Sequence, residues 1–308
     1  MKFEIKSIIF ILFFGLVVST LKGQNIDPII KGKFFRQNLA IRNFFISKSF
    51  NIYTCFNENQ NYLFDKLMKQ GYVNTFFDDF NYFDTKKWRI GQPWGSFIPN
   101  ITHQYYGQNT VYTANGCLYL IGKHEPKAFK VADSVINIPY NVGLINSDIS
   151  FKQKFGFFEI RCKMPNGAAT WPAFWLTGAT RWPPEIDIFE NYGLKNGKKI
   201  HTQSTTVHWG KDNHSSRGFW SVGKKYAKSN DTLFHTYACE WTPDNIKFFT
   251  DGKLIRWIKL SKKMKYWLNE EMVIIINNGF HDKYLSYLPS NFENNALIVD
   301  WIRVYKKY

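Results

Sequence analysis

Residues 184–190, with the sequence PEIDIFE, place three carboxylates among large apolar side chains. Isoleucine and phenylalanine favour strands, so this stretch is predicted to form a buried β-strand. Side chains alternate along a strand, which puts Glu185 and Asp187 on one face and Glu190 on the other. A β-bulge, one extra residue between Asp187 and Glu190, would return the third carboxylate to the face of the first two. Three acids on one face repel one another and lose hydration, so the pattern indicates a reaction centre.

Retaining glycoside hydrolysis is the chemistry that uses two carboxylates with a third between them. One carboxylate attacks the anomeric carbon, and the other, which is protonated, donates its proton to the leaving oxygen. The two carboxyl groups lie about 5–5.5 Å apart. With one residue absorbed by the bulge, Glu185 and Glu190 are about four strand steps apart, roughly 13 Å between Cα atoms, and long side chains on a bent strand close most of that distance. Asp187 can hydrogen-bond the attacking carboxylate and tune the proton affinities of Glu185 and Glu190. The residues alone leave open which glutamate attacks, and they leave open a strand with an ordinary polar face.

From residue 72 onward the chain is predicted to form many short strands separated by turns. Residues 155–164 alternate clearly between apolar and polar, and Asn115-Gly116 is a hairpin signal. Further strands are predicted at 117–121, 235–241, 246–249, 273–276 and 297–305. Helical periodicity is weak, so the pattern favours an all-β sandwich or barrel.

These segments, in this order, resemble glycoside hydrolase family 16 in its bulged E-x-D-x-x-E form. The matching landmarks are the opening segment 76–88, FFEIR at 157–161, WPAFWL at 171–176, EWTP at 240–243, FTDG at 249–252 and VDWIRVY at 299–305. The resemblance covers residues 72–308 and implies a β-jelly-roll sandwich of two curved antiparallel sheets, concanavalin-like, with a glycan lying across the concave face. It implies an endo-acting, retaining hydrolase in which Glu185 matches the nucleophile, Asp187 the assisting acid and Glu190 the acid/base.

Five polar or aromatic residues are candidates for sugar contacts around these acids. Trp182 and Trp171 are expected to stack on sugar faces, because pyranose CH faces are apolar; core packing is the alternative for each. His208 is expected on an exposed strand face, where it would hydrogen-bond the sugar or the acid/base, or serve a structural role. Gln203 and Asn277 are further candidates for contacts with sugar hydroxyls.

The choice of polysaccharide stays open at this point. The WPAFWL block and the bulged strand look like laminarinases, which cleave β-1,3-glucans, and this substrate is slightly favoured. Agarases, porphyranases and carrageenases share the bulged form, and Pro184 stands where laminarinases usually have glycine. A sulfated galactan would suit basic loops, with Arg181, Lys211, His214 and Arg217 as sulfate contacts. A catalytically inactive glycan-binding lectin and a transglycosylase are the alternatives of another class.

The chain is strongly basic, with a formal net charge of +16. That charge would suit an anionic glycan or nucleic acid, or it reflects a lysine-rich coding habit. The lysines are scattered and no nucleic-acid-binding motif is present, so we expect a polysaccharide as partner, no nucleic acid, and a monomer.

The first 23 residues have the pattern of a secretory signal peptide. Lys2 and Lys6 precede the apolar run 8–18, which is shorter than the about 20 residues of a typical transmembrane helix; an uncleaved anchor is the alternative. We expect the protein to be secreted, periplasmic or at the cell surface, with no membrane attachment in the mature form. Residues 24–71 are predicted to be an N-terminal extension of unknown role, ahead of a catalytic domain at 72–308.

Four cysteines are present, Cys55, Cys117, Cys162 and Cys239. No C-x-x-C pair or Cys/His cluster accompanies them, so a structural zinc site is not expected. Cys162 and Cys239 are predicted to be small core residues, and a disulfide stays open for an exported protein. No cofactor is expected for catalysis. The family resemblance implies a structural calcium ion on the convex side, with Asp300 as a candidate ligand.

Overall fold

A computed structural model describes residues 67–98, 103–192, 194–195, 198–199, 202–211, 214–221 and 233–308, with backbone only at 194–195, 198–199, 202 and 214–221. All of them belong to one compact unit, Cys55–Tyr308. The predicted signal peptide, most of the predicted extension and Cys55 lie outside the described residues. Within the described part of the chain, no helix is long and apolar enough to span a membrane.

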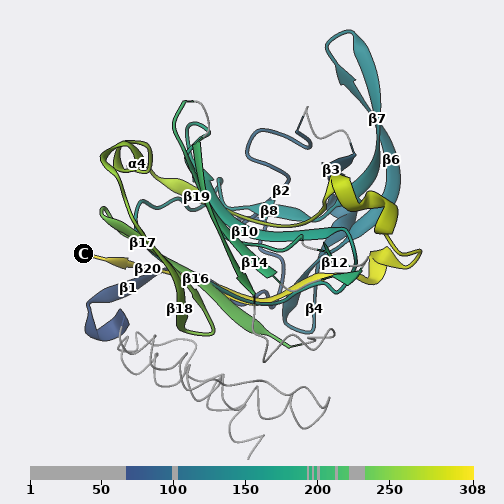
Figure 1. Ribbon diagram of the computed structural model, residues 1–308. Helices are drawn as coiled ribbons and strands as arrows, with labels where there is room; N and C mark the ends of the chain where they lie inside the picture. Colours follow the sequence, from purple (N-terminus) through teal and green to yellow (C-terminus); the bar gives the residue numbers. More distant parts are fainter. Residues whose placement is uncertain are drawn as a thin grey trace, which may run out of the picture. The chain divides into compact units, whose positions relative to one another are not determined.

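Two antiparallel sheets form the body of this unit (Figure 1). The eight-stranded sheet runs β18-β17-β16-β9-β20-β5-β4, with β1 also paired to β20. Its strands are β1 (Tyr72–Asp78), β4 (Val111–Ala114), β5 (Cys117–Leu120), β9 (Gly156–Lys163), β16 (His235–Trp241), β17 (Asn245–Thr250), β18 (Lys253–Lys259) and β20 (Leu297–Lys307). The predicted hairpin at Asn115-Gly116 joins β4 to β5, and both turn residues have positive φ, as such a turn requires.

The seven-stranded sheet runs β15-β14-β11-β10-β19-β8-β2. Its strands are β2 (Arg89–Ile90), β8 (Leu144–Asn146), β10 (Thr170–Gly178), β11 (Glu185–Glu190), β14 (Thr202–Trp209), β15 (His214–Ser221) and β19 (Met272–Phe280). The carboxylate-bearing strand β11 is therefore central, between β10 and β14.

Smaller elements surround the two sheets. A three-stranded sheet of β3 (Gln104–Tyr106), β7 (Ser134–Val142) and β6 (Gly122–Val131) carries the long β6–β7 hairpin that extends away from the body in Figure 1. The remaining elements are η2 (Gln108–Thr110), β12 (Leu194–Lys195), β13 (Lys198–Lys199), α4 (Lys262–Trp267), η3 (Asp282–Tyr287) and η4 (Phe292–Asn294).

The main hydrophobic core lies between the two sheets. Ile186, Ile188 and Phe189 of β11 are fully buried in it. Phe189 meets Tyr237 of β16 with ring centroids 4.8 Å apart, which joins one sheet to the other. Burial of each such apolar side chain contributes about 1.5–3 kcal/mol. The structure confirms the predicted all-β jelly-roll sandwich.

Cysteine burial also follows the prediction. Cys162 and Cys239 are fully buried members of the main core, with free thiols. Both thiols act as small apolar side chains there, and burial raises the pKa of each.

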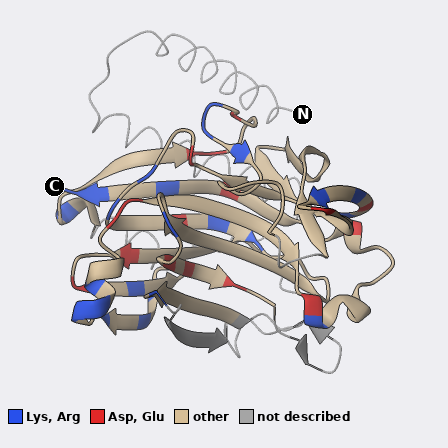
Figure 2. Ribbon diagram, turned by 90° about the horizontal axis from the view of Figure 1, so that it is seen from above, with Lys and Arg blue, Asp and Glu red and all other residues tan. Residues whose placement is uncertain are grey.

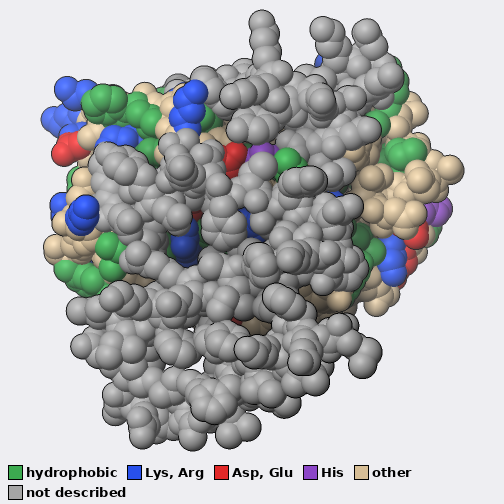
Figure 3. All heavy atoms as spheres, turned by 90° about the horizontal axis from the view of Figure 1, so that it is seen from below, with side chains coloured by type: hydrophobic (Ala, Val, Ile, Leu, Met, Phe, Trp, Pro, Cys, Tyr) green, Lys and Arg blue, Asp and Glu red, His purple; other side chains and the backbone are tan. Residues whose placement is uncertain are grey.

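Positive charge is spread over many elements. Figure 2 shows Lys and Arg on several strands and loops with Asp and Glu among them, and in Figure 3 Lys and Arg appear both near the edges and toward the centre of the face shown. Some of these cations are paired, for example Arg303 with Glu159 at 2.7 Å and Arg89 with Asp148 at 3.2 Å. Positive and negative side chains are therefore interspersed on the elements that Figure 2 shows.

Candidate active site

The predicted bulge is present in β11. On the β10 side, Trp175 pairs with Asp187 and Phe174 with Phe189, so Ile188 has no opposite residue. On the β14 side, the register also shifts between Asp187 and Glu190. Ile188 and Phe189 thus both point into the core, and Glu190 returns to the face that carries Glu185 and Asp187.

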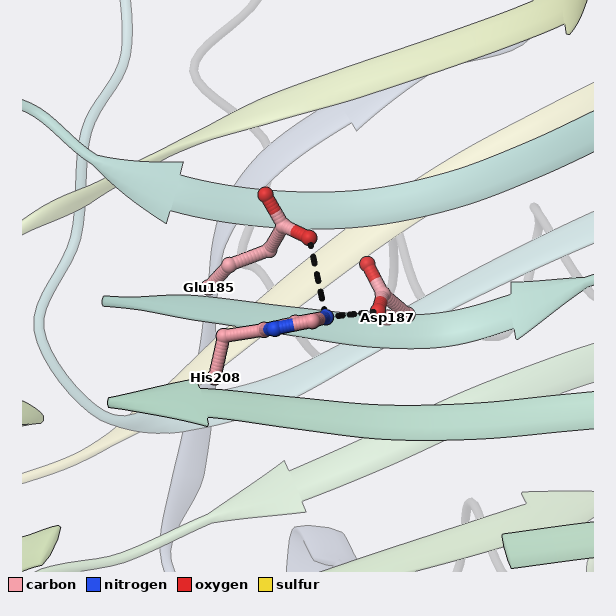
Figure 4. A group of neighbouring side chains, drawn as sticks. All are labelled: Glu185, Asp187 and His208. Carbon is pink, nitrogen blue, oxygen red and sulfur yellow. Dashed lines mark ion pairs between the residues drawn. The ribbon is translucent and has the colours of Figure 1, made fainter. Parts of the chain in front are cut away.

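Glu185, Asp187 and His208 form one contact group (Figure 4). Glu185 and His208 are direct neighbours across β11 and β14. His208 Nε2 lies 3.5 Å from Glu185 Oε1 and 3.5 Å from Asp187 Oδ2. On the other carboxylate oxygen, Trp182 Nε1 donates to Glu185 Oε2 at 2.7 Å. The structure thus places two predicted sugar-binding residues, Trp182 and His208, in contact with the Glu185 carboxylate.

The environment of Glu185 favours its protonated form. Burial raises the pKa of its carboxyl well above the ordinary 4.5, and the nearby charges of Asp187 and, more weakly, Glu190 add to the rise. His208 and the hydrogen bond from Trp182 lower the same pKa. A carboxyl whose pKa is raised by some close neighbours and lowered by others is typical of acid/base centres.

Glu190 is held from two sides. Trp171 Nε1 donates to Glu190 Oε1 at 2.9 Å, and Thr206 Oγ1 donates to Oε2 at 3.4 Å. The Trp171 ring lies 5.9 Å from the ring of Tyr192 and 5.1 Å from that of His281, between centroids. The Trp171 side chain is partly exposed, so it lies on the open face of the sheet rather than in the core.

Gln203 is not on the open face, and its predicted contact with sugar is wrong. It is 1% exposed, and its Nε2 donates to Ile188 O at 3.0 Å inside the core. The reason is strand parity: His208, five residues along β14, faces outward, so Gln203 faces inward.

Asn277 lies on β19 with its side chain half-buried and both amide ends engaged. Its Oδ1 accepts from Trp175 Nε1 at 2.8 Å, and its Nδ2 donates to Trp171 O at 3.2 Å. The amide thus fixes two tryptophan positions beside the acids, and its predicted contact with sugar hydroxyls stays a prediction.

Arg181 is committed to neighbours other than the acids. Its Nε donates to Glu270 Oε2 at 3.1 Å, and its guanidinium lies 4.5 Å from the centroid of the Trp267 ring. Because Glu270 already matches this charge, the structure argues against the predicted role of Arg181 in holding sugar or sulfate.

The other predicted sulfate contacts lie on or beside β15. Lys211 is exposed. His214 and Arg217 occupy positions opposite Trp209 and Thr206 in the register of β14 and β15. Their side chains lie outside the described residues.

The contacts of Asp300 argue against its predicted role as a calcium ligand. Arg161 donates to its carboxylate in a buried ion pair, so a cation already neutralises the group that would face the metal. Within the described part of the chain, three His, Cys, Asp or Glu side chains lie close enough together to share a metal ion only at Glu185, Asp187 and His208.

Several residues at the site escaped the sequence-based prediction. Alternation from His208 along β14 would have found Thr206. Tyr192, two residues after Glu190, would have followed from the same rule once the bulge was placed. His281 had no local signal, because it reaches Trp171 from beyond the end of β19, about a hundred residues away in sequence.

Comparisons with known proteins agree with this geometry. The sequence model of "Glycosyl hydrolases family 16" matches residues 102–286. A "Beta-glucanase" of Rhodothermus marinus is 30% identical over 259 residues, covering 74% of this chain and 83% of that protein. "Glucan endo-1,3-beta-glucosidase A1" of Niallia circulans is 27% identical and covers 75% of this chain, which spans only 37% of that longer protein.

Two further comparisons concern fold and substrate. The laminarinase catalytic domain of Thermotoga maritima shares the fold with a TM-score of 0.63 at 22% identity, over 77% of this chain and 99% of that domain. A "Keratan-sulfate endo-1,4-beta-galactosidase" of Sphingobacterium multivorum is 25% identical over 179 residues, covering 55% of this chain and 41% of that protein.

Proposed function

We propose a specific activity for this chain, which belongs to glycosyl hydrolase family 16 and is a glycoside hydrolase. The proposal is that it cleaves internal β-1,3-linkages of a glucan by double displacement. The observation that carries it is the bulge at Ile188, which places Glu185, Asp187 and Glu190 on one open face, with a tryptophan N–H on each glutamate.

In the first step we assign Glu190 as general acid and Glu185 as nucleophile. Glu190 gives its proton to the glycosidic oxygen while a Glu185 oxygen bonds to the anomeric carbon, and the leaving sugar departs as an alcohol. His208 and Trp182 favour the ionised form of Glu185 that this attack needs, against the effects of burial and Asp187.

In the second step the glycosyl ester on Glu185 is hydrolysed. Ionised Glu190 takes a proton from water, the water oxygen bonds to the anomeric carbon, and Glu185 leaves as a carboxylate, so both groups regain their initial states. Asp187, 3.5 Å from His208 Nε2, shares that imidazole with Glu185 and assists the change of charge on the nucleophile.

Support for a β-1,3-glucan comes from the relatives of known activity, whose names include a β-glucanase and an endo-1,3-β-glucosidase. The test is reducing-end release by the purified protein on laminarin and mixed-linkage glucan, with product masses and a Glu185→Gln control. Oligosaccharides of several lengths in early samples would indicate internal cleavage. Failure on both glucans, with a folded protein, would overturn the glucan assignment.

A sulfated β-galactan is the second candidate, for a specific reason. The net charge is +16, Lys211 is exposed beside β14, and one relative is named for cleaving keratan sulfate. The same assay on keratan sulfate, agarose, porphyran and carrageenan separates the two proposals. Lys211→Ala should then weaken action on the sulfated polymer and leave the action on its desulfated form unchanged.

Export and a monomeric state belong to the same proposal. The basic and apolar pattern of residues 1–23 supports export. N-terminal sequencing of the protein recovered from culture medium and light scattering of the purified chain test the two statements.

A further inference from the structure

The bulge in β11 leaves a polar group to be satisfied inside the core. An extra residue in a strand is skipped by the ladder, and its backbone groups need other partners. Ile188 is that residue: it has no opposite residue on β10 and is fully buried. Its carbonyl accepts a hydrogen bond of 3.0 Å from Gln203 Nε2.

Gln203 is anchored at its other end as well. Its Oε1 accepts a hydrogen bond from Thr250 Oγ1, on β17 of the opposite sheet. The orientation of the amide is dictated by chemistry, because the Ile188 carbonyl only accepts and must therefore face the NH₂ group. Gln203 is 1% exposed and Thr250 7%, so both bonds lie in the interior, where they are strong and their loss is costly.

We propose that Gln203 is a positioning residue that clamps the bulge and thereby holds Glu190 on the open face. Glu190 lies two residues beyond Ile188, and without the bulge its side chain would point into the core. The clamp ties this register to the opposite sheet through Thr250. The inference rests on the proposed function, since it gives Glu190 the acid/base role.

The test separates positioning from ordinary stability. In Gln203→Leu, hydrolysis of a polysaccharide should fall about 10- to 100-fold, because small displacements of a catalytic group cost that much. An aryl β-glycoside with a dinitrophenolate leaving group needs little protonation in the first step, so its kcat/KM, which reports that step, should fall less than about threefold. Glu190→Gln should show the same preference for the good leaving group.

Asn278→Leu is the matched control. Asn278 is also a fully buried amide in the seven-stranded sheet, and it donates to Leu120 O and Asn295 O at 2.9 Å each, away from the bulge. Its variant should lower the melting temperature and slow both substrates equally. An equal loss on both substrates in Gln203→Leu would overturn the clamp.

Two milder variants cover the case in which Gln203→Leu fails to fold. Thr250→Val removes the anchor and should show a weaker form of the same leaving-group preference, and Thr250→Ser keeps the hydroxyl and should restore ordinary behaviour. Equal behaviour of the two variants would overturn the clamp. If Glu190→Gln itself shows no leaving-group preference, the proposed role of Glu190 is wrong and this inference falls with it.

Discussion

Trp182 is expected to control the ionisation of the nucleophile. Its Nε1 donates to Glu185 Oε2 at 2.7 Å, and this bond lowers the pKa of the Glu185 carboxyl. Trp182→Phe keeps an aromatic ring and removes the donor. A hydrogen bond to a charged group contributes about 1.5–3 kcal/mol. Because Trp182 is 49% exposed, we take about 1 kcal/mol, which disfavours the carboxylate about fivefold.

The assay is the pH dependence of kcat/KM on a soluble glucan. Under the proposed mechanism activity requires ionised Glu185, so the acidic limb should move to higher pH in Trp182→Phe, with the loss greatest on that limb and smaller on the plateau. Trp94→Phe is the matched control, because Trp94 is equally exposed at 49% and lies in another loop. An acidic limb that stays in place in Trp182→Phe, or moves to lower pH, would refute the assignment of this bond to the ionisation of the nucleophile.

Three further predictions concern the acids. Asp187→Asn removes a charge that raises the pKa of Glu185. The acidic limb of the residual activity should therefore move to lower pH, opposite to the shift in Trp182→Phe. Glu185→Gln should abolish turnover yet raise the melting temperature at neutral pH. Because the pKa of Glu185 is raised in the folded protein, ionisation of this carboxyl lowers the folding stability as the pH rises above its ordinary pKa of 4.5, and has no such effect below it. The melting temperatures of the wild type and of Glu185→Gln should therefore converge below that pH. Glu190→Gln should lower kcat/KM, which reports the first step, at least tenfold more for substrates with poor leaving groups than for activated ones, and a uniform loss of kcat/KM would contradict an acid role.

The alternation of apolar and polar residues predicted those parts of the site whose geometry is set within a single strand. The three acids, the bulge between them and the placement of His208 on the open face all follow from alternation and from the apolar residues that must be buried. The same rule, counted from His208, would have placed Gln203 inside.

Partners distant in sequence could not be predicted in this way. Arg181 meets Glu270 across 89 residues, and Asp300 meets Arg161 across 139. Each pairing depends on which strands become neighbours in the folded sheets, and no local pattern carries that information. The charges of Arg181 and Asp300 are matched by these distant partners, which argues against their predicted roles.

The bulge itself follows from a comparison of burial energies. Ile188 and Phe189 are adjacent and apolar, and a regular strand could bury only one of them. It would leave Phe189 exposed, which forfeits about 1.5–3 kcal/mol. It would also force Glu190 into the core, where an unpaired charge costs several kcal/mol more. A bulge costs about one ladder hydrogen bond, about 0.5–1.5 kcal/mol, and Gln203 replaces it at the Ile188 carbonyl. The apolar pair between Asp187 and Glu190 therefore drives the three carboxylates onto one face, and the proposed clamp from Gln203 stabilises that register.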